Sequence, residues 1–139
     1  MNLKVWIVTG AFIGGLAMPV LAAAGQDAVL ALYKTQAIAD DSAFAGFSAD
    51  RGKAFYASSN SGGSPDTPSC SSCHTASPLK AGMTRAGKAI EPMAVSVSPA
   101  RFTDAAKTEK WFGRNCKTVL GRACSAQEKG DFITYLNGL

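Results

Sequence analysis

The residues CSSCH at positions 70–74 bring two thiols and an imidazole together within one short stretch. Cys70 and Cys73 have the spacing at which two cysteines add to the vinyl groups of a haem, and His74 then coordinates the iron from one face. The motif therefore predicts one covalently attached haem c with His74 as an axial ligand. Because the sequence has no other histidine, the opposite face of the iron needs a different ligand or stays open.

The chain begins with a segment that is typical of exported proteins. Lys4 precedes a long apolar run, and Ala22 and Ala24 form a small-residue cleavage pattern. We therefore expect a signal peptide at 1–24 and a mature haem-binding domain at 25–139, with no membrane span after cleavage. Export predicts a periplasmic protein, because haem is attached to thiols outside the bacterial cytoplasm. A retained membrane anchor is the alternative.

The mature chain carries a small positive charge. The full sequence has 14 Lys and Arg, so loss of Lys4 leaves 13 against 10 Asp and Glu, a net charge of +3. Two haem propionates would lower this to about +1. The basic residues are scattered and do not alternate with aromatic residues, so we predict no nucleic-acid site. A basic patch that faces an acidic protein is an alternative to an ordinary solvated surface.

Two cysteines remain once the haem motif has used Cys70 and Cys73. Cys116 and Cys124 are close in sequence, and disulfides persist in the oxidising compartment that an exported chain enters. We therefore expect a disulfide between them, which would stabilise the fold by about 2.5 kcal/mol in the chain-entropy model. Two free buried thiols are the alternative.

Helical patterns cover much of the mature chain, and no segment alternates long enough to predict a strand. The sequence therefore predicts an all-α, cytochrome c-like fold whose helices wrap around the haem. Prolines and glycines after His74 exclude a long helix there, so we expect a loop around the haem edge. An exposed loop is expected at 58–69. Helices are expected at about 27–39, 48–58, 103–121 and 125–138.

Capping residues mark the ends of these helices. The candidate caps are Ser48 or Asp50 for the second helix, Thr103 or Asp104 for the third with Gly121 as its stop, and a Ser125/Glu128 capping box for the last, which ends at Gly138. The residues expected on apolar faces are Val29, Leu30, Leu32, Tyr33, Ala54, Phe55, Ala57, Phe132, Ile133, Tyr135 and Leu136.

The loop after His74 offers two kinds of residue as second ligand. Met93 is a soft thioether ligand that would raise the reduction potential, whereas Met83 is too close to His74 to reach around the ring. A methionine that packs on the haem edge is the alternative reading. Lys80 and Lys88 would have to lose a proton to bind iron. An iron with no second ligand is a further alternative.

The helix expected at 103–121 offers an amide. At 100° per residue, Trp111, Asn115, Thr118 and Val119 fall on one stripe with Phe112 at its border. Trp111 and Phe112 are therefore candidates for contact with the haem. A buried amide needs a partner or costs about 1–3 kcal/mol. Asn115 is either an iron ligand or an amide that bonds to backbone or water.

Four segments of the sequence form a recognisable set: PDTPSCSSCH (65–74), TRAGKAIEPMA (84–94), RFTDAAKTEKWFGRNC (101–116) and LGRACSAQEKGDFITYL (120–136). Together they resemble the Sphaeroides haem protein family, an oxygen-binding group of c-type cytochromes, and the Cys116 and Cys124 pair is part of the likeness. The resemblance implies that Asn115 is the sixth ligand of ferric iron and leaves on reduction, and that the ferrous site binds oxygen, nitric oxide or carbon monoxide. A related group has histidine at this position.

Three functions follow as expectations. The first is a periplasmic cytochrome that accepts an electron and then binds a diatomic gas, with a small dihaem cytochrome c as the donor that the resemblance implies. The second is an electron carrier with Met93 on the iron. The third is an enzyme that converts oxygen, peroxide or nitric oxide. We favour a non-enzymatic role over the third, since His74 is the only histidine and no distal His–Arg pair is available.

Overall fold

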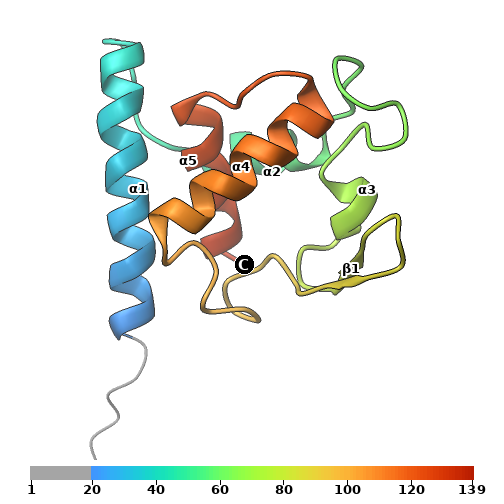
Figure 1. The fold of residues 1–139 in the computed structure, drawn as a ribbon. Helices are drawn as coiled ribbons and strands as arrows, with labels where there is room; N and C mark the ends of the chain where they lie inside the picture. The colour runs from blue at the N-terminus through green and yellow to red at the C-terminus, as the bar shows by residue number, and fades with distance from the viewer. Residues whose placement is uncertain (1–19) are drawn as a thin grey trace, which may run out of the picture.

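The computed structural model describes the backbone of residues 20–139 and the side chains from residue 25 onward. The predicted signal peptide lies outside the described residues except at its end, where the first helix begins. None of the helices in this part of the chain is long and apolar enough to cross a membrane. The elements are α1 (Val20–Asp40), α2 (Ala49–Ala57), α3 (Ser71–His74), β1 (Gly82–Met83), β2 (Ala89–Ile90), α4 (Ala105–Leu120) and α5 (Ala126–Asn137) (Figure 1).

Helices dominate the structure, so the all-α prediction is confirmed, with one small addition. β1 and β2 pair antiparallel, with Gly82 opposite Ile90 and Met83 opposite Ala89. Gly87 closes the hairpin between them with φ +77°, a left-handed conformation that favours glycine. A strand of two residues is too short to show an alternating pattern, and the sequence therefore did not predict it.

The helix ends follow the capping residues read from the sequence. Ser48 caps α2 and Asp104 caps α4, each through a side-chain oxygen that accepts a backbone N–H. Ser125 and Glu128 form the expected capping box at the start of α5. α4 ends at Gly121, whose φ of +73° gives a left-handed cap.

The buried face of α1 differs from the prediction in one residue. Val29, Tyr33 and Ala37 are buried and recur every four residues, so they lie on one side of the helix. Leu32 was predicted to be on the apolar face, but its side chain is 53% exposed. It lies off the stripe that these three residues form.

The apolar face predicted for α2 was largely wrong. Ala54 and Ala57 are exposed, whereas Gly52 and Tyr56 are buried. The reason is the close approach of α5: a Cβ atom on Gly52 would lie 2.0 Å from the carbonyl oxygen of Asp131. α2 therefore packs against α5 through the face that carries Gly52, where the absence of a side chain lets the two backbones approach closely.

A buried carboxylate fixes α2 against α5. The Asp131 side chain is 5% exposed and accepts from the Nε and Nη2 atoms of Arg51 at 2.7 and 2.8 Å. The backbone N–H of Ser48 donates to the same carboxylate at 2.6 Å. Asp131 thus has partners for its charge inside the fold, as a buried carboxylate requires.

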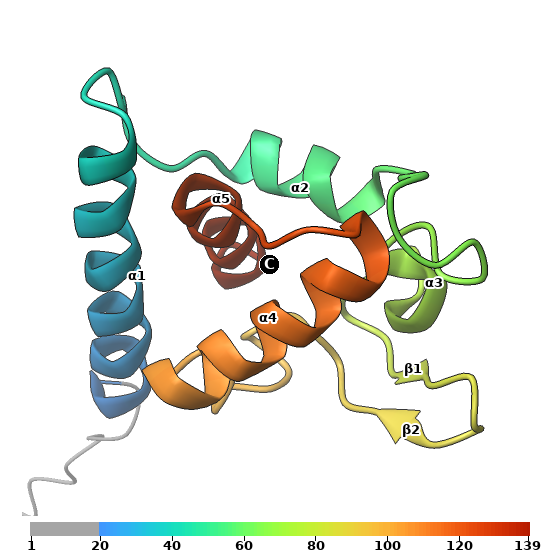
Figure 2. The ribbon, with the colours of Figure 1, turned by 45° about the horizontal axis from the view of Figure 1, so that its top comes forward.

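α5 occupies the centre of the molecule, with α1, α2 and α4 around it (Figure 2). Phe132 on α5 is the hub of the aromatic core. Its ring centroid lies 6.3 Å from that of Phe55, 6.0 Å from Tyr56, 6.4 Å from Phe102 and 5.6 Å from Phe112. These contacts bring α2, the segment before α4, and α4 itself onto one face of α5.

A disulfide joins α4 to the segment before α5. The structure pairs Cys116 with Cys124, whose Cα atoms are 5.6 Å apart, and both residues are 6% exposed. The bridge holds the last turns of α4 beside the turn that leads into α5.

We expect Cys116 and Cys124 to resist alkylation in the folded, unreduced protein, because both sulfurs are bonded. Mass spectrometry of the haem-loaded protein, in which Cys70 and Cys73 are bonded to the haem, should show no added alkyl group after iodoacetamide treatment until the protein is reduced and denatured. Replacing both cysteines by serine should lower the free energy of unfolding in urea by about 2.5 kcal/mol. Uptake of two alkyl groups without reductant would contradict the bridge.

Candidate haem site

α3 holds the two thiols and the imidazole on a single helical turn. Cys70 precedes α3, and its carbonyl oxygen accepts from the backbone N–H groups of Cys73 at 3.3 Å and His74 at 3.1 Å. Neither Cys70 nor Cys73 forms a disulfide. Burial raises the pKa of the Cys70 thiol to about 11, opposite to the lowering that activates redox cysteines. The Cys70 thiol is therefore not activated for disulfide exchange.

The chain leaves α3 through a strained residue. Thr75 has φ +63°, which for a residue other than glycine costs of the order of 1–3 kcal/mol. The hydroxyl of Tyr56 lies 2.9 Å from the carbonyl oxygen of His74 and 2.7 Å from that of Thr75, and it donates to them. The Thr75 hydroxyl donates to the carbonyl of Ser77 at 2.9 Å. These hydrogen bonds hold the turn that follows the imidazole.

The imidazole of His74 is held in its neutral form. Burial, and secondarily the charge of Arg101, lower the pKa of His74 to about 4. Its Nδ1 atom is buried and has no hydrogen-bond partner among the described residues. Neutral imidazole is the form that binds a metal. A neutral histidine next to two unpaired thiols is the donor set that haem c requires, so these residues fit the cofactor.

No long helix follows α3, as predicted, and the loop there folds back on itself. The carbonyl oxygen of Pro78 accepts from the N–H groups of Met93 and Ala94 at 2.8 and 3.0 Å. A Cβ atom on Gly82 would lie 2.1 Å from the carbonyl oxygen of Cys73, so β1 packs directly on α3. The loop is thus closed against the attachment motif.

Arg101 completes the closure of this loop. Its Nε and Nη2 atoms donate to the carbonyl oxygens of Pro92 and Glu91, both at 2.5 Å. Burial lowers the pKa of Arg101, although the charge of Glu91 acts in the opposite direction. Arg101 is partly buried, and its positive charge contributes to the lowered pKa of His74.

The stripe predicted on α4 divides into two faces. Phe112 and Val119 are each 8% exposed and belong to the core face, where Phe112 packs on Tyr33 with ring centroids 6.0 Å apart. Trp111 is 48% exposed, and Asn115 and Thr118 are exposed on the neighbouring flank. Within the protein chain itself, Asn115 therefore lies beside the core face of α4 and not among the core side chains.

The loop at 58–69 runs from α2 to α3 and contacts α4 on the way. The N–H of Ser64 donates to the carbonyl oxygen of Thr118 at 2.8 Å, and Thr67 is buried. The loop was predicted to be exposed but is partly covered where it meets α4. Both views place α3 beside the C-terminal end of α4, the half of the helix that carries Asn115 (Figures 1 and 2).

The other candidate ligands lie elsewhere. Met93 is 7% exposed and belongs to the hydrophobic core cluster, whereas Met83 is 59% exposed on the hairpin. Lys80 and Lys88 are solvent exposed. The structure thus gives Met93 a packing role, as in the alternative reading of that residue.

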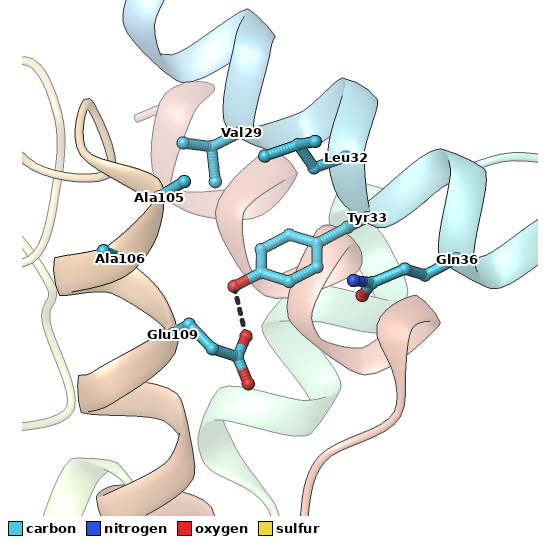
Figure 3. Close-up of a pocket in the computed structure, with 7 residues that line it drawn as sticks. All are labelled: Val29, Leu32, Tyr33, Gln36, Ala105, Ala106 and Glu109. Atoms are coloured by element: carbon cyan, nitrogen blue, oxygen red, sulfur yellow. Dashed lines mark hydrogen bonds between the residues drawn. The ribbon is translucent and has the colours of Figure 1, made fainter.

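A separate hollow of about 260 Å³ lies between α1 and the start of α4 (Figure 3). Tyr33 donates to Glu109 at 2.9 Å, and Lys129 donates to both oxygens of Glu109 at 2.7 and 2.8 Å. Burial alone would raise the pKa of Glu109, but the hydrogen bonds from Lys129 and Tyr33 outweigh it and lower the pKa. These contacts connect α4 to α1 and α5. The lining residues are Val29, Leu32, Tyr33, Gln36, Ala105, Ala106 and Glu109.

Sequence reasoning missed two residues of the site, Tyr56 and Arg101. Tyr56 is 2% exposed, and a tyrosine in that position needs a partner for its hydroxyl. It lies four residues after Gly52, so both are on one face of α2. Arg101 gave a weaker signal, as a lone charge at the end of a loop rich in proline and glycine.

We expect Tyr56→Phe to lower the free energy of unfolding by about 1–3 kcal/mol, because the carbonyl groups of His74 and Thr75 lose their donor. Urea unfolding of the haem-loaded protein measures this change. Tyr135→Phe is the control, since Tyr135 packs at 6.0 Å from Tyr56 without contacting α3 carbonyls. Equal losses in both variants would contradict a special role for the Tyr56 hydroxyl.

We expect Arg101→Gln to lower the reduction potential of the haem-loaded protein, because a positive charge near His74 favours the reduced iron. In an effective dielectric of about 20, one charge at about 10 Å from the iron would shift the potential by roughly 70 mV. Arg101→Lys, which keeps the charge, should retain most of the potential. Spectroelectrochemical titration checks both variants, and an unchanged potential in Arg101→Gln would contradict the electrostatic role.

Comparison with known proteins gives consistent results. Residues 42–136 match a family described as a domain of unknown function (DUF1924). The chain is 52% identical to cytochrome c-type protein SHP of Cereibacter sphaeroides over 103 residues. This aligned region covers 73% of this chain and 80% of that protein.

Two solved structures share the fold. The structure of oxidised SHP, an oxygen-binding cytochrome c, matches with a TM-score of 0.75 and 45% identity over 82% of this chain and 96% of that chain. The solution structure of cytochrome c'' from Methylophilus methylotrophus, determined to explain haem-ligand detachment, matches with a TM-score of 0.69 and 33% identity, covering 81% and 92% of the two chains. The predicted resemblance is confirmed, and the chain belongs to the SHP family of c-type cytochromes, with their all-α fold and haem c.

Proposed function

We propose that this protein is an exported, periplasmic cytochrome that accepts an electron and, when reduced, binds oxygen, nitric oxide or carbon monoxide. The observation that carries the proposal is the match to the oxygen-binding SHP over nearly all of that chain. One haem is attached through Cys70 and Cys73, and His74 remains bound to the iron in both oxidation states. The single-turn geometry of α3 supports this assignment.

When bound, the haem would supply an iron that can be oxidised and reduced. His74 and Asn115 would hold that iron in the oxidised protein. An amide is a weak ligand that suits the harder ferric iron better than the softer ferrous iron, so Asn115 would be the ligand to leave on reduction. The related cytochrome c'' is described with the structural basis of haem-ligand detachment, which supports this proposal.

The released amide keeps a second role. Its N–H groups can donate a hydrogen bond to a gas molecule that acquires partial negative charge, which stabilises that molecule. Asn115 lies on the half of α4 that is beside α3, so its short side chain is on the side of the helix where the attachment motif lies (Figures 1 and 2). One residue thus closes the oxidised site and assists the reduced one.

The electron donor in this proposal is a small dihaem cytochrome c, which is the partner that the family resemblance implies. An electron carrier with Met93 as ligand is less well supported, because Met93 is part of the hydrophobic core. A peroxide-cleaving enzyme is also less well supported, since the sequence has no distal histidine.

We expect Asn115→Ala to open the ferric iron or leave it water-bound, and to leave the ferrous spectrum almost unchanged, because the ligand has already departed there. Carbon monoxide should bind both the variant and the unmodified protein after reduction. Oxygen should bind roughly fivefold less tightly to the variant, for the loss of one hydrogen bond of about 1 kcal/mol. Ferric, ferrous and carbon monoxide spectra test the assignment.

Two further variants control this experiment. Asn115→His should give a low-spin ferric spectrum, because imidazole is the stronger ligand. Met93→Ala should leave the ferric ligand in place. If Met93→Ala changes the ferric spectrum and Asn115→Ala does not, the ligand is methionine and the electron-carrier function replaces the proposal.

A further inference from the structure

The basic side chains that are scattered in the sequence gather in the fold on one edge of α4. Lys107, Lys110, Arg114 and Lys117 are all exposed, and they follow one another at steps of three, four and three residues. Such steps keep side chains on one face of a helix. At 1.5 Å per residue, they form a row about 15 Å long, which we call the α4 basic ridge.

The ridge is not neutralised by the rest of the protein. Within residues 20–139, none of the four ion pairs involves a ridge residue. The acidic residue of α4 is Glu109, which is already bound to Lys129 and Tyr33. The ridge therefore presents four unpaired cations to solvent.

This helix also carries the whole net charge of the mature chain. α4 has four basic residues and one acidic residue, a net charge of +3. The mature chain has 13 basic and 10 acidic residues, so the remainder has nine of each (13 − 4 and 10 − 1) and is neutral. A charge concentrated on one helix gives the protein a strong directional field, which orients an approaching charged partner.

The ridge borders the flank of α4 that carries the predicted iron ligand. Arg114 directly precedes Asn115, and its guanidinium lies 5.9 Å from the centre of the Trp111 ring. Trp111 is itself a candidate for contact with the haem. The ridge therefore runs directly beside the flank of α4 that is predicted to face the haem.

We propose that the α4 basic ridge is the docking surface for an acidic electron-donor protein that presents a row of carboxylates. The inference rests on the proposed function in one respect, since it takes the partner to deliver an electron to the haem. Charge complementarity selects the partner: the row of four cations is the positive region of a protein whose other side-chain charges balance and whose haem propionates are negative, so it orients an acidic protein with its contact surface against α4. A protein docked there lies next to the residue that controls the iron.

The test uses the ferric, haem-loaded mature protein and reduced flavodoxin, an acidic electron-transfer protein, as the probe. Lys110→Gln/Lys117→Gln removes two ridge charges without touching Arg114 or Trp111. The matched control is Lys34→Gln/Lys53→Gln, which removes two exposed charges from α1 and α2 and gives the same net charge. Glutamine and lysine have similar helix propensities, so the helices should be retained in both variants.

Stopped-flow reduction at about 0.01 M ionic strength should be roughly fivefold slower for the ridge variant and nearly unchanged for the control. At about 1 M ionic strength, where the Debye length is about 3 Å, the difference should disappear. Reduction by the uncharged semiquinone of lumiflavin should be equally fast in all three proteins, because it needs no docking surface.

Several results would overturn the proposal. Equal slowing in both variants would attribute the effect to net charge, and no slowing of the ridge variant would exclude docking there. If lumiflavin also reduced the ridge variant more slowly, the substitutions would have altered the haem site itself and not a docking surface. Loss of binding to phosphatidylserine vesicles with an unchanged flavodoxin rate would assign the ridge to membranes instead. Failure of the proposed gas binding would appear separately, as an absent carbon monoxide spectrum in the unmodified protein.

Discussion

The hydrogen bond from Tyr56 to the carbonyl groups of His74 and Thr75 is the contact on which the haem site depends. α3 has four residues, and a helix of one turn does not persist in water by its own hydrogen bonds. Contacts with other parts of the protein must therefore hold α3 in place. Tyr56 provides such a contact and links α3 to the centre of the fold, because the Tyr56 ring packs on Phe132 of α5. The attachment motif is thus oriented by the packing of α2 on α5, a helix from the other end of the chain.

The sequence predicted features that depend on neighbouring residues and missed those that depend on distant ones. The caps at Asp104 and Ser125 and the stop at Gly121 follow from local chemistry, and the structure has them. The buried face of α2 does not follow from local chemistry. Ala54 looks as suitable for burial as Gly52, and only the approach of the α5 backbone selects glycine.

The residues of the candidate haem site also fall into two groups, those that a local motif predicts and those that depend on distant contacts. CSSCH specifies its chemistry within five residues, so the sequence sufficed for both thiols and the imidazole. Arg101 comes 27 residues after His74, and its influence depends on how the loop closes through Pro92 and Glu91. For Asn115, helical periodicity identified the stripe but not which flank the core covers. That choice depends on where Phe112 meets Phe132, a contact that no local pattern encodes.

The attachment of α4 at both ends bears on how the proposed ligand exchange would occur. Near its start, Glu109 is bound to Lys129 and Tyr33. Near its end, Cys116 is bonded to Cys124. A helix fixed at two points does not shift easily, because its packed core face allows discrete arrangements and not gradual sliding. In the proposed exchange, Asn115 would therefore leave the iron most simply by rotation of its own short side chain, and the fixed helix would bring the amide back to the same place on reoxidation.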